Sequence, residues 1–136
     1  MRIDHIGIAV QNLQEAIQHF QKILGQPPDE IERVEQEGVE VAFFTTDNGP
    51  DIELLAPLSP HSPIARFIEK RGEGIHHIAF ASNDLNQEIQ RLRPHFEVLY
   101  DPPRPGARNK QVTFLHPRQT HGVLIEFCQK ISPTLS

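Results

Sequence analysis

The sequence predicts an α+β fold in which a βαβββ module occurs twice. The chain has 136 residues, which suits one compact domain and is too short for two conventional ones. The second half repeats the first at an offset of 72 residues, so that Asp4–Ala9 aligns with His76–Ala81. Apolar residues alternate along the expected strands and recur at spacings of four along the expected helices. Neither module has enough mass to bury a core alone, so we expect two paired modules to pack or curl together as a single domain.

Composition excludes several classes of protein. Hydrophobic residues make up 38% of the chain and charged residues 23%, which is typical of a globular protein rather than a disordered one. The formal net charge is −5 and basic residues do not cluster, so we expect no nucleic-acid partner. The sequence contains no signal-like or membrane-spanning apolar stretch, and its single cysteine cannot form an internal disulfide. We therefore expect a cytoplasmic protein with no membrane partner.

The first module, about 1–56, reads strand, helix, strand, strand, strand. In its first strand His5, Gly7 and Ala9 alternate with larger apolar residues. A helix follows, which the polar residues Gln11 and Asn12 can cap at its start and which Gly25, with Pro27 and Pro28, brings to an end. Apolar runs predict the remaining strands near 31–34, around Val41 and Phe43, and around Ile52 and Glu53.

A proline-rich linker and a short helix, together 57–73, separate the two modules, and Gly72 marks the end of that helix. The second module, about 74–130, repeats the first: a strand, a helix and further strands. The polar residues Asn83 and Asp84 can cap this helix, and Pro94 stops it or kinks its last turn. These strands are expected near 96–100, around Val112 and Phe114, and around Ile125 and Glu126. The proline-rich segment 101–106 lacks backbone donors, so we expect a loop beside the site there.

Four residues at repeat-related positions predict a metal site. His5 corresponds to His77, and Glu53 corresponds to Glu126. Two imidazoles and two carboxylates brought together by a pseudo-twofold axis form a suitable set of ligands for a divalent transition metal. The small residues that alternate with His5 and His77 along their strands leave room for a ligand, and a carboxylate in an apolar strand needs a partner.

The other residues with metal-binding or nucleophilic side chains have simpler interpretations. Cys128 is expected to be a small apolar strand residue rather than a nucleophile. His76 is expected to face away from His77, and five histidines are expected to be solvated: His19, His61, His95, His116 and His121. Arg104, Arg108 and Lys110 form either a solvated loop or a clamp for an anionic substrate.

Several stretches together resemble the vicinal oxygen chelate superfamily, also called the glyoxalase superfamily. The resemblance covers nearly the whole chain and is most specific at 3–10, 52–58, 62–65, 72–80, 114–117 and 122–126. Within the superfamily the chain is similar to the coenzyme A thioester epimerases that act on methylmalonyl-CoA. The resemblance implies a cupped mixed sheet around one divalent metal ion, commonly Co²⁺ or Mn²⁺, in a homodimer. Carried over by position, His5, Glu53, His77 and Glu126 match the metal ligands.

The reaction implied by this resemblance is epimerisation of (R)- and (S)-methylmalonyl-CoA at C2. Proton abstraction would give an enolate whose charge the metal ion stabilises, and inversion needs proton transfer on both faces of C2. Some relatives carry a catalytic glutamate after a Gly-Val pair, but Val41 occupies that position here and Glu40 stands beside it. The candidate acid/base residues are therefore Glu126 and Glu40, with Glu37 as a third. The loop before Lys110 also departs from relatives, which often have two glycines there.

Two alternatives use the same fold. A glyoxalase-type lyase that acts on a thiol adduct would need the same ligand types and the same proton abstraction. A metal-free small-molecule-binding module of the superfamily would lack the ligand set, so the intact quartet counts against it.

Overall fold

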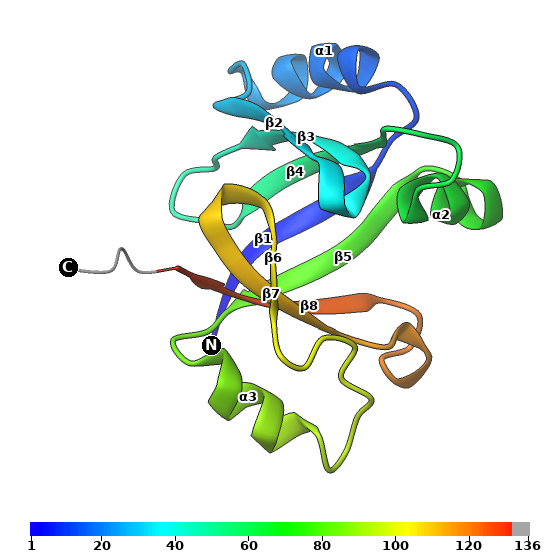
Figure 1. Ribbon diagram of the computed structural model, residues 1–136. Coiled ribbons are helices and arrows are strands. Elements are labelled where there is room, and N and C mark those ends of the chain that lie inside the picture. Colours follow the sequence, from blue (N-terminus) through cyan, green and yellow to red (C-terminus); the bar gives the residue numbers. More distant parts are fainter. Residues whose placement is uncertain (132–136) are drawn as a thin grey trace. The chain divides into compact units, whose positions relative to one another are not determined.

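The computed structural model describes residues 1–131 (Figure 1). The chain forms two compact units. The first unit is His5–His77; the second consists of Met1–Asp4 and the chain from Ile78 onward. None of the helices in the described range has both the length and the apolar composition that a membrane crossing requires.

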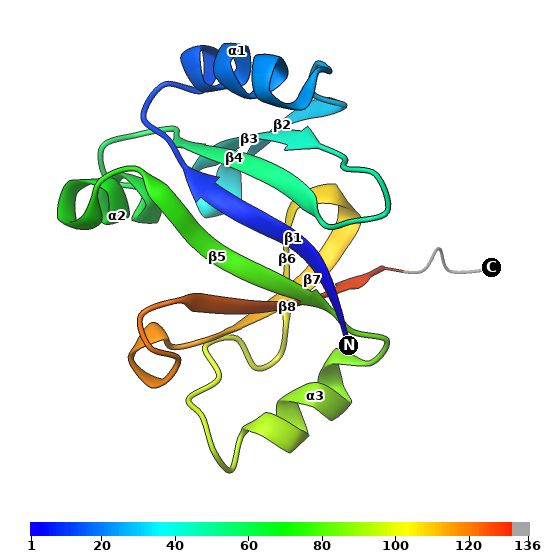
Figure 2. The same ribbon diagram turned by 180° about the vertical axis from the view of Figure 1, so that it is seen from behind.

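The first unit has the predicted strand, helix, strand, strand, strand order, followed by a short helix (Figures 1 and 2). Its strand order is β2-β3-β4-β1-β5, in which β1 runs parallel to β4 and the β2–β3–β4 pairs are antiparallel. The elements are β1 (Arg2–Ala9), α1 (Leu13–Leu24), β2 (Glu30–Val34), a 3₁₀ turn (Glu35–Glu37), β3 (Val39–Phe44), β4 (Asp51–Pro57), α2 (Pro63–Arg71) and the start of β5 (Gly74–Ala81).

The second unit repeats this order, and its strands follow β5-β8-β7-β6. The β6–β7 and β7–β8 pairs are antiparallel. After β5 come α3 (Leu85–Leu92), β6 (Arg104–Pro105), a 3₁₀ turn (Ala107–Asn109), β7 (Lys110–Leu115), a 3₁₀ turn (Pro117–Gln119) and β8 (Leu124–Lys130). The α+β fold class predicted from the repeat is thus confirmed.

Local signals in the sequence define the helix ends. The Asn12 side chain accepts a hydrogen bond from the backbone N–H of Glu15, and the Asp84 side chain accepts one from Gln87. Each satisfies an N–H group that has no partner within its helix. Gly25 ends α1 in the left-handed conformation, with φ 75°, which a residue with a Cβ adopts only at a cost.

In each unit, one face of the strands packs against a helix. In the first unit α1 packs on a core that includes Ala42, Phe44, Leu54 and Ala56. In the second unit α3 packs on a core that includes Leu115 and Phe127. Because successive strand residues point to opposite faces, these contacts decide which side chains lie on the other face of each sheet.

The strand expected near 96–100 is not a strand in the structure. Only Val98 forms an isolated bridge there, with Leu115, and the edge strand of this unit is the two-residue β6 at Arg104–Pro105. The proline-rich segment therefore contributes a short edge strand, the position in a sheet where a missing backbone donor is tolerated.

Candidate functional site

Three of the four predicted ligands meet within the first unit. Nε2 of His5 lies 3.1 Å from Nε2 of His77, and Nδ1 of His5 lies 3.2 Å from Oε2 of Glu53. One ligand atom from each residue lies within 4.8 Å of the other two. All three side chains are buried, with relative exposures of 4–6%. The strands β1, β4 and β5 therefore gather three metal-binding side chains in one buried place.

Strand register explains why these side chains meet. Gly7 on β1 pairs with Glu53 on β4 in parallel register, so Glu53 shares a face with Gly7 and His5. This face is opposite to the one that α1 covers, because the α1 core contains the alternate residues Leu54 and Ala56.

Gly7 has a steric role at this cluster. A Cβ on Gly7 would lie 2.1 Å from Cε1 and 2.5 Å from Nδ1 of His77, closer than van der Waals contact allows. The His77 ring therefore occupies the space that a side chain at position 7 would fill. The sequence predicted a small residue at position 7, and the packing of the His77 ring requires one there.

The donor chemistry of the cluster fits a divalent transition metal. The His5 ring presents Nδ1 to Glu53 and Nε2 to His77, so each of its nitrogens faces one of the other two candidate ligands. Two nitrogens bound at right angles about 2.1 Å from one ion would lie about 3.0 Å apart, close to the observed separation of 3.1 Å. Buried imidazoles with a buried carboxylate are also the ligand types that such ions prefer.

Glu126 lies in the second unit, on β8, and is 6% exposed. It pairs with Phe114 on β7 and therefore shares a face with Phe114, opposite to the face with Leu115 and Phe127 that packs against α3. Glu53 and Glu126 thus hold equivalent positions in their units, each buried on the sheet face that its helix leaves uncovered.

Glu40 is not part of the cluster. It pairs with Ala56 on β4, a residue of the α1 core, so its side chain points to the α1 face of the sheet. Val41 points to the opposite face, together with its partner Leu55, and is 1% exposed. On the face that carries Glu53, β3 therefore presents the apolar side chain of Val41.

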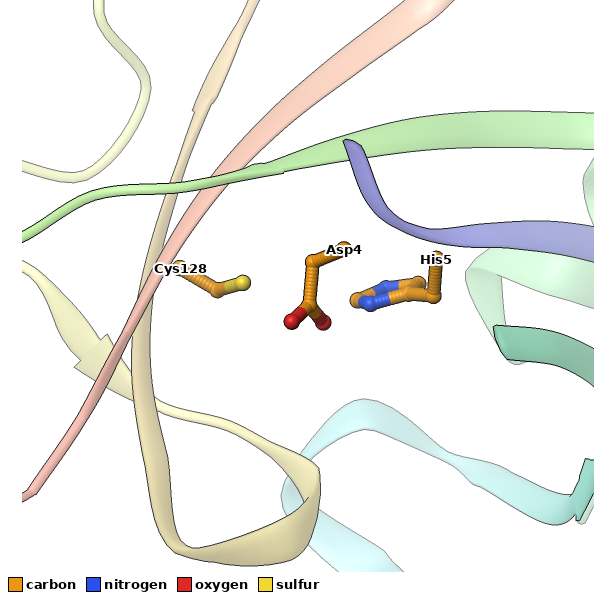
Figure 3. Close-up of side chains that lie close together, drawn as sticks. All are labelled: Asp4, His5 and Cys128. Carbon is orange, nitrogen blue, oxygen red and sulfur yellow. The ribbon is translucent and has the colours of Figure 1, made fainter. Parts of the chain in front are cut away.

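A buried ion pair in the second unit was not predicted from the sequence. Nζ of Lys110 lies 2.6 Å from Oδ2 of Asp4, and both side chains are largely buried. The Asp4 carboxylate also points toward the Cys128 thiol (Figure 3). Burial, and then the Asp4 and Glu126 carboxylates, raise the pKa of Cys128 well above its usual value, so the thiol is a poor nucleophile. The sequence analysis offered Lys110 as part of a clamp for an anionic substrate. In the structure its ammonium group forms an ion pair with Asp4.

The two adjacent histidines on β5 are both held in the neutral form. Burial lowers the pKa of His76 to about 4. Burial, followed by the neighbouring His5 and His76, lowers the pKa of His77 well below its usual value. A neutral imidazole is the form that binds a metal ion, so these surroundings keep His77 ready to act as a ligand.

We expect the metal-free protein, kept in a chelator, to lose stability as the pH falls. Between 6.5 and about 4 the unfolded chain binds a proton at His76 that the folded chain does not, so the free energy of unfolding falls over this window. The loss is about 3 kcal/mol or less for this residue. Urea unfolding at a series of pH values measures it. The pH dependence should shrink in His76→Gln and stay unchanged in His19→Gln, which alters an exposed helix residue; an unchanged slope in both would contradict the assignment.

Comparison with known proteins shows the family of the chain. Residues 4–114 match the family model described as Glyoxalase/Bleomycin resistance protein/Dioxygenase superfamily. The chain is 42% identical to the Bacillus subtilis protein YqjC, over 94% of this chain and 91% of that one. It is 37% identical to the ethylmalonyl-CoA/methylmalonyl-CoA epimerase of Cereibacter sphaeroides, over 94% of this chain and 97% of that one.

Solved structures show the same fold. A hypothetical protein from Bacillus halodurans superimposes with a TM-score of 0.91 at 43% identity, covering 99% of this chain and 98% of that one. A variant of the Streptomyces coelicolor methylmalonyl-CoA epimerase in complex with 2-nitronate-propionyl-CoA gives a TM-score of 0.89 at 36% identity, covering 97% and 96%. From the sequence match, the fold and the coverage of whole chains, it follows that this protein belongs to the glyoxalase/bleomycin resistance/dioxygenase superfamily and, within it, to the methylmalonyl-CoA epimerase family of isomerases.

Proposed function

We propose that this protein epimerises methylmalonyl-CoA at C2 with the help of a bound divalent metal ion. The observation that carries this proposal is the buried meeting of His5, Glu53 and His77 on three strands of the first unit. The names of relatives that match over almost their full length support the substrate class, a coenzyme A thioester. The resemblance also supports a homodimer.

His5, Glu53 and His77 would hold the ion, and the repeat assigns Glu126 as a fourth ligand. Two observations support this assignment. Glu126 is buried, and it lies on the face of the strands that α3 leaves uncovered, the position equivalent to that of Glu53 in the first unit. Two imidazoles and two carboxylates accept both Co²⁺ and Mn²⁺. When bound, the ion supplies Lewis-acid stabilisation of the negative charge that develops on the thioester oxygen.

The side chains around the cluster favour this chemistry. Val41 and Phe43, on the same face as Glu53, are almost completely buried and exclude water from this part of the sheet. Charge interactions are stronger in such surroundings than in water. The proton at C2 must leave one face and return to the other, so two acid/base groups are needed, and Glu126 is proposed as one of them.

Exchange of the C2 proton tests the proposed function. Methylmalonyl-CoA incubated with the protein in heavy water should incorporate deuterium at C2 and convert one stereoisomer into the other. A chelator should abolish both reactions, and added Co²⁺ or Mn²⁺ should restore them. Absence of exchange in the metal-loaded protein would contradict the proposal, and turnover of a thiol adduct of an α-oxoaldehyde instead would favour a lyase.

A further inference from the structure

His76 is a titratable side chain on β5 that the proposed chemistry does not use. Its Nδ1 lies 2.9 Å from Nδ1 of His77, and the two ring planes are nearly perpendicular, at 89°. Successive strand residues point to opposite faces, and for this reason the sequence predicts that His76 faces away from His77. Nδ1 is the ring nitrogen nearer the backbone, however, so the two rings can share a hydrogen bond beside the strand. A hydrogen bond therefore joins His76 to one of the proposed metal ligands.

Each nitrogen of the His77 ring faces a different neighbour. Nε2 lies 3.1 Å from Nε2 of His5, so it is the nitrogen directed at the cluster, and Nδ1 lies against His76. A neutral imidazole carries one hydrogen, and the nitrogen without it has the lone pair that binds a metal ion. With Nε2 of His77 as the ligand atom, its hydrogen is on Nδ1, which donates to Nδ1 of His76. His76 accepts this bond and carries its own hydrogen on Nε2.

Further contacts hold the two rings in this arrangement. The His76 ring makes an edge-to-face contact with Phe67, with ring centres 4.9 Å apart and planes at 86°. Phe67 belongs to α2, which lies beside the start of β5 (Figures 1 and 2). Cε1 of His77 occupies the space that a Cβ on Gly7 would take. Burial lowers the pKa of His76 to about 4, so at neutral pH this ring is neutral and can accept a hydrogen bond.

We propose that His76 is a positioning residue of the metal site, whose Nδ1 accepts a hydrogen bond from Nδ1 of His77 and so directs Nε2 of His77 to the ion. This inference rests on the proposed function, because it takes His77 as a ligand. Hydrogen-bond partners of this kind fix the tautomer and the ring orientation of a metal-binding histidine, and their loss lowers metal affinity about 10- to 100-fold. His76 acts through His77 and is not itself a ligand.

The first test compares the metal affinity of His76→Leu and His76→Asn. Leucine and asparagine have nearly the same size and shape, and both remove the ring that packs on Phe67. Asparagine alone keeps an acceptor, its Oδ1, close to the position of Nδ1. Isothermal titration with Co²⁺ should therefore show affinity about 10- to 100-fold weaker in His76→Leu and partly recovered in His76→Asn, with circular dichroism as the check on folding. Wild-type affinity in His76→Leu would overturn the inference, and so would equal losses in the two variants.

The second test needs no variant and observes the ring hydrogens directly. Wild-type protein loaded with Zn²⁺, a diamagnetic ion that accepts the same ligand types, is suited to ¹H–¹⁵N NMR of the imidazole rings. The hydrogen of His77 should be on Nδ1 and that of His76 on Nε2, whereas a hydrogen on Nδ1 of His76 would overturn the inference. Wild-type protein that binds no divalent ion would instead remove the metal-dependent function. Metal binding and C2 exchange in the wild type, with undiminished affinity in His76→Leu, would remove the positioning role alone.

Discussion

The His5→Ala protein is expected to lose its metal ion and its epimerase activity and to keep its fold. Nε2 of His5 faces Nε2 of His77, and Nδ1 of His5 contacts Glu53, so this side chain links the other two candidate ligands. A metal ion that acts as a Lewis acid contributes several kcal/mol to transition-state stabilisation in enzymes generally, and each ~1.4 kcal/mol is a factor of ten in rate. Activity should therefore fall by at least ~100-fold. Metal analysis of the purified protein, C2 exchange and circular dichroism measure the three outcomes.

The control for this variant is His19→Ala. His19 is an exposed residue of α1, so its replacement should leave metal content and exchange unchanged. Glu126→Ala extends the test to the fourth ligand, which the repeat alone assigns. Full metal occupancy in His5→Ala would refute the ligand set, whereas full occupancy in Glu126→Ala would restrict the set to the three residues of the first unit.

The Gly7→Ala protein is expected to lose metal affinity although position 7 offers no ligand atom. The new Cβ would lie 2.1 Å from Cε1 of His77, so the imidazole ring must move. Overpacking of this kind costs about 1–3 kcal/mol of stability. Isothermal titration with Co²⁺ or Mn²⁺ should show weaker binding, and urea unfolding should give a lower free energy of unfolding.

Gly25→Ala is the matched control for this second prediction. Gly25 has φ 75°, so alanine there is strained, but no other residue lies within 4 Å of the added Cβ. This variant should lose stability by about 1 kcal/mol and keep the metal affinity of the wild type. Equal metal affinity in Gly7→Ala and Gly25→Ala would show that the His77 ring does not depend on the glycine.

The repeat accounts for most of what the sequence could predict. It places the strands and helices of both modules in order. The helix ends could be predicted as well, because caps such as Asn12 and Asp84 and the helix-ending Gly25 act through neighbouring residues. It also selects His5, Glu53 and His77, whose meeting depends on each lying in a strand with small or apolar neighbours.

Other features depend on contacts that local patterns do not encode. Residues 39–44 are apolar on both faces of β3 apart from Glu40, so alternation could not show that Glu40 points toward α1 and Val41 away from it. The ion pair of Asp4 and Lys110 joins residues 106 positions apart. At 96–100 the apolar pattern of a strand is satisfied by packing on the α3 core, in which Phe96 and Val98 take part.

The central place of β1 bears on how the chain acquires its structure. This strand precedes β4 and β5 in the chain, yet it lies between them in the sheet, and their residues are synthesised some tens of positions later. Pairings between such distant segments form slowly compared with local ones. His5 is therefore synthesised well before His77, and the proposed ligands of the first unit are complete only in chains that have grown past residue 77.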